Sequence, residues 1–321
     1  MTLYLHIGTP KTGTSALQSF LNVNADYLKQ QGLYYPCAGW SPERMAGLKG
    51  DDEKPQARKT LKGRCGDMLR RYDIDYRSPG NAREIAQMEI GRVHGYFQSL
   101  CSYAASMNCD VLLSSEGFWE DVIDKAAYFE QLKGLSAQIK VIVYLRRQDV
   151  YLSSSANQRI KANRSQNHSI KYLDCLQNFA DESRPLFPDY LEELEKIANE
   201  IGRENIIVRR YKKGISIVDD FLPLIGITKD ARYVCPPKTV NPHLSKTGIK
   251  IMCWTKAHIR SKWVWTLVCY ILLDIGKLSG RGNDELFLWD ENVRKDILDK
   301  YEESNNRLAR LYMNEDRLFD R

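Results

Sequence analysis

The feature that most constrains this chain is a short apolar segment that runs directly into a glycine-bearing loop. Residues 2–8 read TLYLHIG, which is typical of a buried strand, and from Thr14 onward apolar residues recur on one face of a helix. The loop between them reads GTPKTGTS. Strand, glycine loop and helix is the order in which nucleotide-binding α/β domains begin, so this opening predicts an α/β fold.

The rest of the chain continues this alternation. Four further strands are expected, in GLYYP (32–36) and at 109–116, 140–146 and 205–211. Helical patterns separate them, at 82–107, 149–162, 169–180 and 189–201. Alternating strands and helices predict a P-loop-like core with a mostly parallel sheet flanked by helices, and a ligand at the carboxyl ends of the strands.

Beyond residue 240 the pattern is helical. No strand is evident there, and helices are expected at 244–274 and 290–313. We therefore predict a single domain over 1–321, with a core of about 1–230 and a helical C-terminal extension of about 240–321.

Composition favours a cytoplasmic protein. Eight cysteines contain no C-x-x-C pair, and no signal-peptide pattern is readable at the N-terminus. The longest charge-free run, 263–273, is well below the roughly 20 residues that span a bilayer. We interpret it as a buried helix. A helix on a membrane surface is the alternative, which leaves a peripheral membrane contact open.

The opening loop has the properties of an anion site. Backbone N–H groups at a helix N-terminus converge on an anion, and the helix dipole favours negative charge there. Lys11 adds a point charge, Gly13 permits close approach, and Thr12, Thr14 and Ser15 offer hydroxyl donors. In an NTPase loop the lysine follows the second glycine and precedes a Mg²⁺-binding hydroxyl, whereas Lys11 precedes Gly13. The order of residues argues against a metal-dependent γ-phosphate mechanism.

Two motifs carry a family resemblance. PKTGTS (10–15, Pro10 to Ser15) resembles the 5′-phosphosulfate loop of sulfotransferases that use 3′-phosphoadenosine-5′-phosphosulfate (PAPS). YLRRQDVYLSSS (144–155) resembles their second motif, an arginine at a strand end and a serine eight residues later. Arg146 and Ser154 have this spacing, but Arg147 and Ser155 have it too. We prefer Arg146, because it directly follows the apolar strand, at the edge where ligands bind. Looser matches along the chain are similar to a bacterial, carbohydrate sulfotransferase-like branch.

The resemblance implies a function and a division of roles. The chain would move a sulfuryl group from PAPS to a hydroxyl of a carbohydrate or glycolipid, leaving PAP, with the arginine and serine holding the 3′-phosphate. Lys11 would stabilise the leaving phosphate, and no metal is expected. Candidates for the general base are Glu116, Glu43 and His6.

Further basic side chains indicate the charge of the molecules that the protein binds. Arg209 and Arg210 end a strand at the same predicted edge, where they either reach the ligand or pair with acids of the fold. Residues 44–71 hold nine Lys/Arg against four Asp/Glu, which favours an anionic acceptor. Nucleic acid is not expected, because that stretch lacks aromatic residues for base stacking.

Two other functions stay open: an ATP-dependent small-molecule kinase or NTPase, and a noncatalytic anion- or glycan-binding protein.

Overall fold

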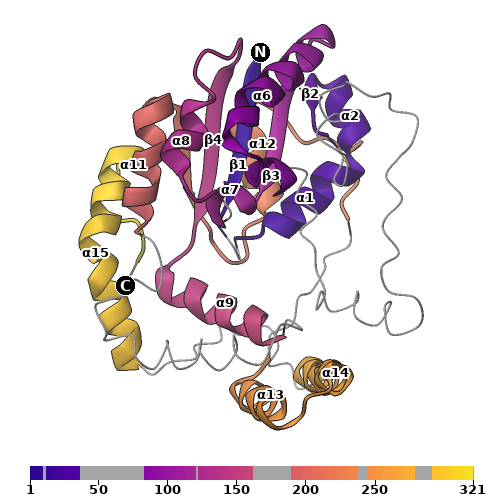
Figure 1. Cartoon of the computed structure of the whole chain (residues 1–321), viewed down its shortest axis with the longest axis vertical. Coiled ribbons are helices and arrows are strands. Elements are labelled where there is room, and N and C mark those ends of the chain that lie inside the picture. Colours follow the sequence, from indigo (N-terminus) through magenta and orange to yellow (C-terminus); the bar gives the residue numbers. More distant parts are fainter. Residues whose placement is uncertain are drawn as a thin grey trace.

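A five-stranded, all-parallel sheet forms the centre of the molecule (Figure 1). The computed structural model describes residues 1–9, 12–36, 83–120, 122–161, 189–236, 244–278 and 291–320. The strands follow the order β2-β3-β1-β4-β5 across the sheet. Their bounds are β1 Thr2–Gly8, β2 Leu33–Tyr34, β3 Asp110–Ser115, β4 Gln138–Leu145 and β5 Ile206–Arg210.

The central strand β1 lies between β3 and β4. Leu5 of β1 is in register with Leu113 on one side and with Val141 on the other. Parallel strands covered on both faces read as nearly continuous apolar runs. The apolar segments of the sequence therefore form strands.

One face of the sheet is covered by three helices, α1 (Thr14–Val23), α2 (Ala25–Gln30) and α12 (Ile217–Leu224). Leu17 and Leu21 of α1 pack with Phe221 of α12 against Ile142 and Tyr144 of the sheet. The one-sided apolar pattern that begins at Thr14 is thus the face that α1 turns to the sheet.

The opposite face is covered by a larger set of helices. It comprises α5 (Arg83–Ala86), α6 (Ile90–Ser106), α7 (Gly117–Glu120), α8 (Lys125–Glu130), α11 (Tyr190–Ile201) and α15 (Glu291–Met313). A short 3₁₀ turn, η1 (Arg203–Asn205), leads from α11 into β5. Leu308 of α15 is fully buried in the same core as Leu5 of β1. The C-terminal helix is therefore part of the main core.

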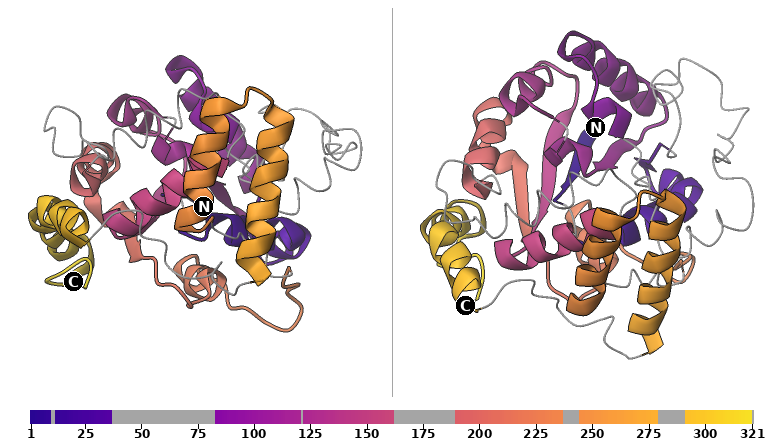
Figure 2. Two further views of the ribbon diagram at one scale, coloured as in Figure 1. Left: turned by 90° about the horizontal axis from the view of Figure 1, so that it is seen from below. Right: turned by 60° about the horizontal axis from the view of Figure 1, so that its bottom comes forward.

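Three helices lie at and beyond the carboxyl edge of the sheet. α9 (Gln148–Lys161) crosses below this edge, and α13 (Lys246–His258) and α14 (Lys262–Leu278) form a hairpin beyond it (Figures 1 and 2). The hairpin packs on α9 through its own small apolar cluster, which includes Ile160, Met252 and Trp265. Among the helices of the described residues, none combines the length and apolar character needed to cross a membrane.

The α/β architecture with a parallel sheet is confirmed, and several details differ from the prediction. The expected helix 82–107 is two helices, α5 and α6, and α12 was not predicted. In the C-terminal part, α15 packs in the main core, whereas α13 and α14 share a separate apolar cluster. The charge-free run 263–273 lies in α14, which buries one face only: Trp265, Cys269 and Leu273 are buried, whereas Trp263 and Ile271 are exposed. The predicted helix 169–180 lies outside the described residues.

Candidate functional site

The strand order places a crevice between the carboxyl ends of β1 and β4. The chain leaves β1 toward β2 and β3 on one side, and leaves β4 toward β5 on the other. In open α/β sheets ligands bind at such a switch point. The opening loop follows β1 and the arginine motif follows β4, so both predicted anion sites border this crevice.

Two glycines shape the loop after β1. A Cβ on Gly8 would lie 2.6 Å from Oγ1 of Thr14, so only glycine lets the strand end meet the first turn of α1. Gly13 has φ +82°, in the left-handed region that favours glycine. Two hydroxyls fix the loop: Thr9 Oγ1 donates to the Tyr144 carbonyl at 2.5 Å, and Thr12 Oγ1 donates to the Thr9 carbonyl at 2.7 Å.

These contacts show which of the predicted loop residues hold the loop in place and which lie at the open N-terminus of α1. Thr12 is buried and its hydroxyl proton is directed at the backbone, so it holds the loop. Gly13 is the N-cap of α1 and supplies no side-chain cap, which leaves the N-terminal end of the helix to another acceptor. Thr14 is buried and Ser15 is half-buried in this first turn. Pro10 and Lys11 lie outside the described residues.

The two arginines after β4 have different surroundings. Arg147 Nε donates to Asp149 Oδ1 at 2.8 Å and its Nη2 donates to Oδ2 at 3.1 Å. Asp149 is fully buried and is also paired with Arg294. Arg147 is thereby committed to an internal ion-pair network, which favours Arg146 as the ligand-binding member of the pair.

The guanidinium of Arg146 lies over the ring of Tyr211, 5.4 Å from its centroid. The same ring lies close to the opening loop, since a Cβ built on Gly13 would lie 3.3 Å from Tyr211 Cε2. The backbone N–H of Tyr211 donates to the Leu145 carbonyl at 2.8 Å, which holds the ring at the strand edge. Tyr211 therefore joins the two predicted anion sites. Our sequence prediction missed it as a site residue, and the available signal was an aromatic residue directly after a strand.

Ser154 lies two turns into α9 and is buried. Its Oγ has no hydrogen-bond partner among the described residues. A buried hydroxyl without a partner costs free energy, so a ligand oxygen that accepted its proton would be stabilising. The side chain of Ser155, its rival, is outside what the structure describes.

Arg209 and Arg210 pair with acids of the fold. Both Nε and Nη2 of Arg209 donate to Asp220, which also accepts from Tyr144 Oη at 2.7 Å. Burial raises the pKa of Asp220, but these hydrogen bonds outweigh it and hold the pKa below its ordinary value. Arg210 pairs with Glu315. The two arginines also line a cavity of about 230 Å³, beside Tyr211, so a structural role and a ligand contact are both compatible with their positions.

His6 lies in the core of the sheet and is fully buried. Its Nδ1 shares a 2.8 Å hydrogen bond with Ser114 Oγ, and its ring packs edge-on against Tyr144 and Phe221. Burial lowers the pKa of His6 to about 3, so the ring is neutral near pH 7. The position two residues before the strand end and the low pKa both favour a core histidine.

Glu116 occupies the carboxyl end of the sheet. It directly follows β3, is half-buried, and precedes α7, whose first N–H, that of Gly117, donates to Ser115 Oγ. The Ser115 hydroxyl, and not the Glu116 carboxylate, therefore accepts from this first N–H of α7. Glu43 and the basic stretch 44–71 lie outside the described residues.

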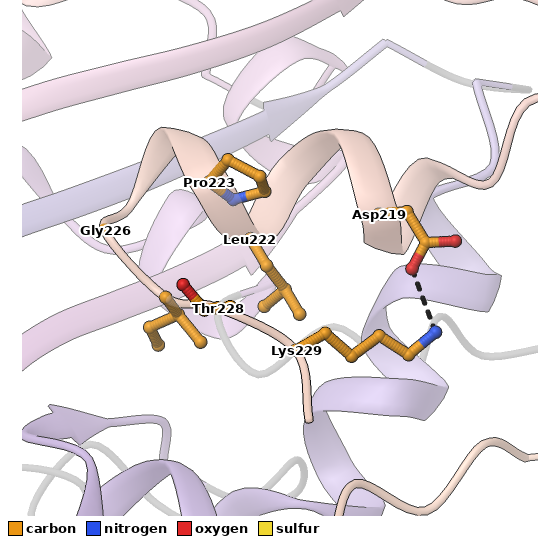
Figure 3. Close-up of a pocket in the computed structure, with 7 residues that line it drawn as sticks. Asp219, Leu222, Pro223, Gly226, Thr228 and Lys229 are labelled. Carbon is orange, nitrogen blue, oxygen red and sulfur yellow. Dashed lines mark hydrogen bonds and ion pairs between the residues drawn. The ribbon is translucent and has the colours of Figure 1, made fainter. Parts of the chain in front are cut away.

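A larger cavity lies away from these residues. It has a volume of about 370 Å³ between the end of α12 and the loop that follows (Figure 3). Leu222 and Pro223 form an apolar wall, and Lys229 Nζ pairs with Asp219 at 2.9 Å. It contains none of the predicted site residues. Within the described ranges, no three His, Cys, Asp or Glu side chains gather in a group that would hold a metal ion.

Comparison with known proteins leaves the family open. No protein-family model matches the chain. An uncharacterized protein of Archaeoglobus fulgidus is 27% identical over 212 residues, which are 63% of this chain and 53% of the relative. The chain thus spans about half the length of this relative.

Proposed function

We propose that this protein is a PAPS-dependent sulfotransferase that transfers a sulfuryl group to a hydroxyl of a carbohydrate or glycolipid. The observation that carries the proposal is the meeting of two anion sites at Tyr211. The guanidinium of Arg146, which follows β4, lies over this ring, and Gly13, at the start of α1, lies close enough that an added Cβ would meet it. A nucleoside that carries one phosphate on the 5′ position and another on the 3′ position of its ribose matches such a pair of sites.

Each site fits one part of the donor. The N-terminus of α1 suits the 5′-phosphosulfate, because its backbone N–H groups and dipole favour an anion. Arg146 and the partnerless hydroxyl of Ser154 suit the 3′-phosphate, which ATP lacks. This second site distinguishes the proposed donor from an ordinary nucleoside triphosphate.

The reaction assigns roles to residues of this chain. A bond forms between the acceptor oxygen and sulfur while the bond from sulfur to the phosphate oxygen breaks. Lys11 and the backbone N–H groups of the loop stabilise the negative charge left on that phosphate. Glu116 is our choice for the base that takes the acceptor proton, because it lies at the end of β3 whereas His6 is buried with a low pKa.

The proposal is tested by ligand-dependent thermal stability. PAP is expected to stabilise the protein by about 2.7 kcal/mol when present at about a hundred times its Kd. Arg146→Gln and Lys11→Ala should lose most of this stabilisation, whereas Glu116→Gln should keep PAP binding and lose transfer from PAPS.

Arg147→Gln is the matched control. It removes the neighbouring guanidinium and lowers the baseline melting temperature, because Asp149 loses a partner, but it should keep the PAP-induced shift. Stabilisation by Mg-ATP without any by PAP would favour a kinase and overturn the proposal. Binding of PAP and PAPS without transfer to any carbohydrate would favour a noncatalytic anion-binding protein.

A further inference from the structure

The α13–α14 hairpin exposes an unusual share of the apolar surface. Thirteen large apolar side chains are exposed among the described residues, and six of them belong to this hairpin. They are Ile251, Trp254, Trp263, Leu267, Ile271 and Ile275. Concentrated exposure of this kind marks an interaction surface, whereas single exposed apolar residues are ordinary.

The spacing of these residues forms stripes along the helices. Trp263, Leu267, Ile271 and Ile275 recur every four residues, so they lie one above another on α14. The other face of α14 is buried against α9 and α13 through residues such as Trp265. The helix is thus apolar on both sides, and its outer stripe is not needed for the packing of the described residues.

The hairpin is held firmly to the body of the protein. Asn157 of α9 donates to the Leu244 carbonyl at 2.9 Å and accepts from the Leu244 N–H at 3.3 Å. Buried Lys256 donates to the Ile160 carbonyl at 2.6 Å. These contacts attach the hairpin beyond the carboxyl edge of the sheet, where Figure 1 shows it.

Charge indicates the kind of partner. Residues 244–278 carry six Lys/Arg, one of which is the buried Lys256, and one acidic residue, Asp274. Lys250 and Arg260 are exposed next to the apolar residues Ile251 and Ile259. A second copy of this chain would bring two such basic surfaces together, which costs free energy, whereas an anionic surface is attracted.

The two exposed tryptophans add a third indication. Trp254 is 60% exposed and Trp263 is 63% exposed, on either side of the turn between the helices. Tryptophan beside basic residues is enriched where proteins meet the headgroup region of a bilayer. We propose that the outer face of the α13–α14 hairpin docks the protein peripherally on a membrane surface that contains anionic phospholipids. This inference does not depend on the proposed sulfuryl donor.

The test compares matched pairs of substitutions in the full chain. Co-sedimentation is measured with vesicles of phosphatidylcholine alone and with vesicles that also contain phosphatidylglycerol. Ile271→Gln with Ile275→Gln removes two exposed residues of the stripe, and Ile90→Gln with Ile123→Gln removes two exposed isoleucines elsewhere. We expect binding to the anionic vesicles, a loss of about tenfold or more in the first pair, and none in the second. All variants should melt as the wild type does.

A parallel comparison addresses charge. Lys250→Gln with Arg260→Gln should weaken binding to the anionic vesicles, whereas Arg92→Gln with Lys295→Gln, also exposed, should not. Three outcomes would overturn the inference: equal binding to both vesicle types, equal effects of the hairpin and control pairs, or a dimer in solution that the Ile271 and Ile275 substitutions dissociate while no vesicle binding is seen.

Discussion

At the level of single residues, hydrogen-bond and ion-pair partners separate side chains between which the sequence leaves an alternative open. Arg146 and Arg147 are adjacent and chemically identical, yet Arg147 is bound to Asp149 and Arg146 lies over Tyr211. Ser154 and Ser155 were equivalent in the same way, and the buried, partnerless hydroxyl of Ser154 now supports its assignment. The pair Arg146 and Ser154 is therefore the better basis for mutagenesis.

His6 should make the protein sensitive to acid. Its pKa is about 3 in the folded state, against 6.5 for an ordinary histidine, because burial disfavours the charged ring. Between these values the unfolded chain binds the extra proton, so stability is present in full above pH 6.5 and is lost as the pH falls. The loss is at most about 1.4 kcal/mol for each pH unit.

Urea unfolding at a series of pH values between 7 and 4 measures this effect. His6→Gln should show a shallower loss of stability with falling pH than the wild type, whereas His94→Gln, at an exposed histidine of α6, should follow the wild type. Parallel curves for the wild type and His6→Gln would show that His6 is not the residue that binds the proton.

At the level of elements, the junction of β1 and α1 depends on backbone conformation as much as on side chains. Gly13 adopts φ +82° at the N-terminus of α1, and a Cβ built on it would meet Tyr211 and Ile217. This left-handed residue directly precedes Thr14, the first residue of the helix, and lies five residues after the end of β1. The helix N-terminus is thereby brought to the carboxyl edge of the sheet, where an anion can reach it.

Gly13→Ala should affect both stability and anion binding. The left-handed conformation costs an alanine about 1–2 kcal/mol, and the new Cβ also meets Tyr211 at 3.3 Å. Gly134→Ala is the matched control, because Gly134 has φ +76° and nothing within 4 Å of the added Cβ. Both variants should unfold at lower urea concentration, but only Gly13→Ala should weaken PAP binding, by about tenfold, in a thermal-shift titration. Equal PAP affinity in the two variants would argue against the loop as the anion site.

At the level of the whole molecule, the C-terminal helices divide between two cores. α15 is joined to the sheet and α9 by buried contacts, including a hydrogen bond of 2.8 Å from Gln148 Nε2 to Asn305 Oδ1. α13 and α14 instead share a small cluster with the end of α9. The hairpin should therefore unfold locally at lower cost than the sheet and α15.

Two leucine truncations test this division. Leu308→Ala, in the main core, should lower the free energy of unfolding by about 2–5 kcal/mol. Leu273→Ala, equally buried in the hairpin cluster, should mainly increase hydrogen exchange in α13 and α14. Global urea unfolding combined with peptide-resolved exchange distinguishes the two effects. A loss of protection across the sheet in Leu273→Ala would show that the hairpin belongs to the main cooperative unit.

The sequence predicted more of the fold than of the candidate site. Apolar runs such as those at β3 and β4 are local signals, and they correctly placed the strands and the α/β class. The short helix α12 was missed, because it has only eight residues and contains Pro223, which is unfavourable inside a helix. The site residues were harder to predict, since partners such as Asp149 for Arg147 or Tyr211 for Arg146 follow from distances between segments.

By itself the sequence determined the class of fold, the strand, loop and helix at the N-terminus, and the two motifs on which the proposed donor rests. These are encoded in short stretches, where periodicity and residue type act locally. Only the tertiary structure decided that Arg146 and Gly13 meet at one tyrosine, that His6 is buried and neutral, and that α14 leaves an apolar stripe exposed. Each of these depends on which segments pack together, because contact, burial and charge pairing arise between residues far apart in the chain.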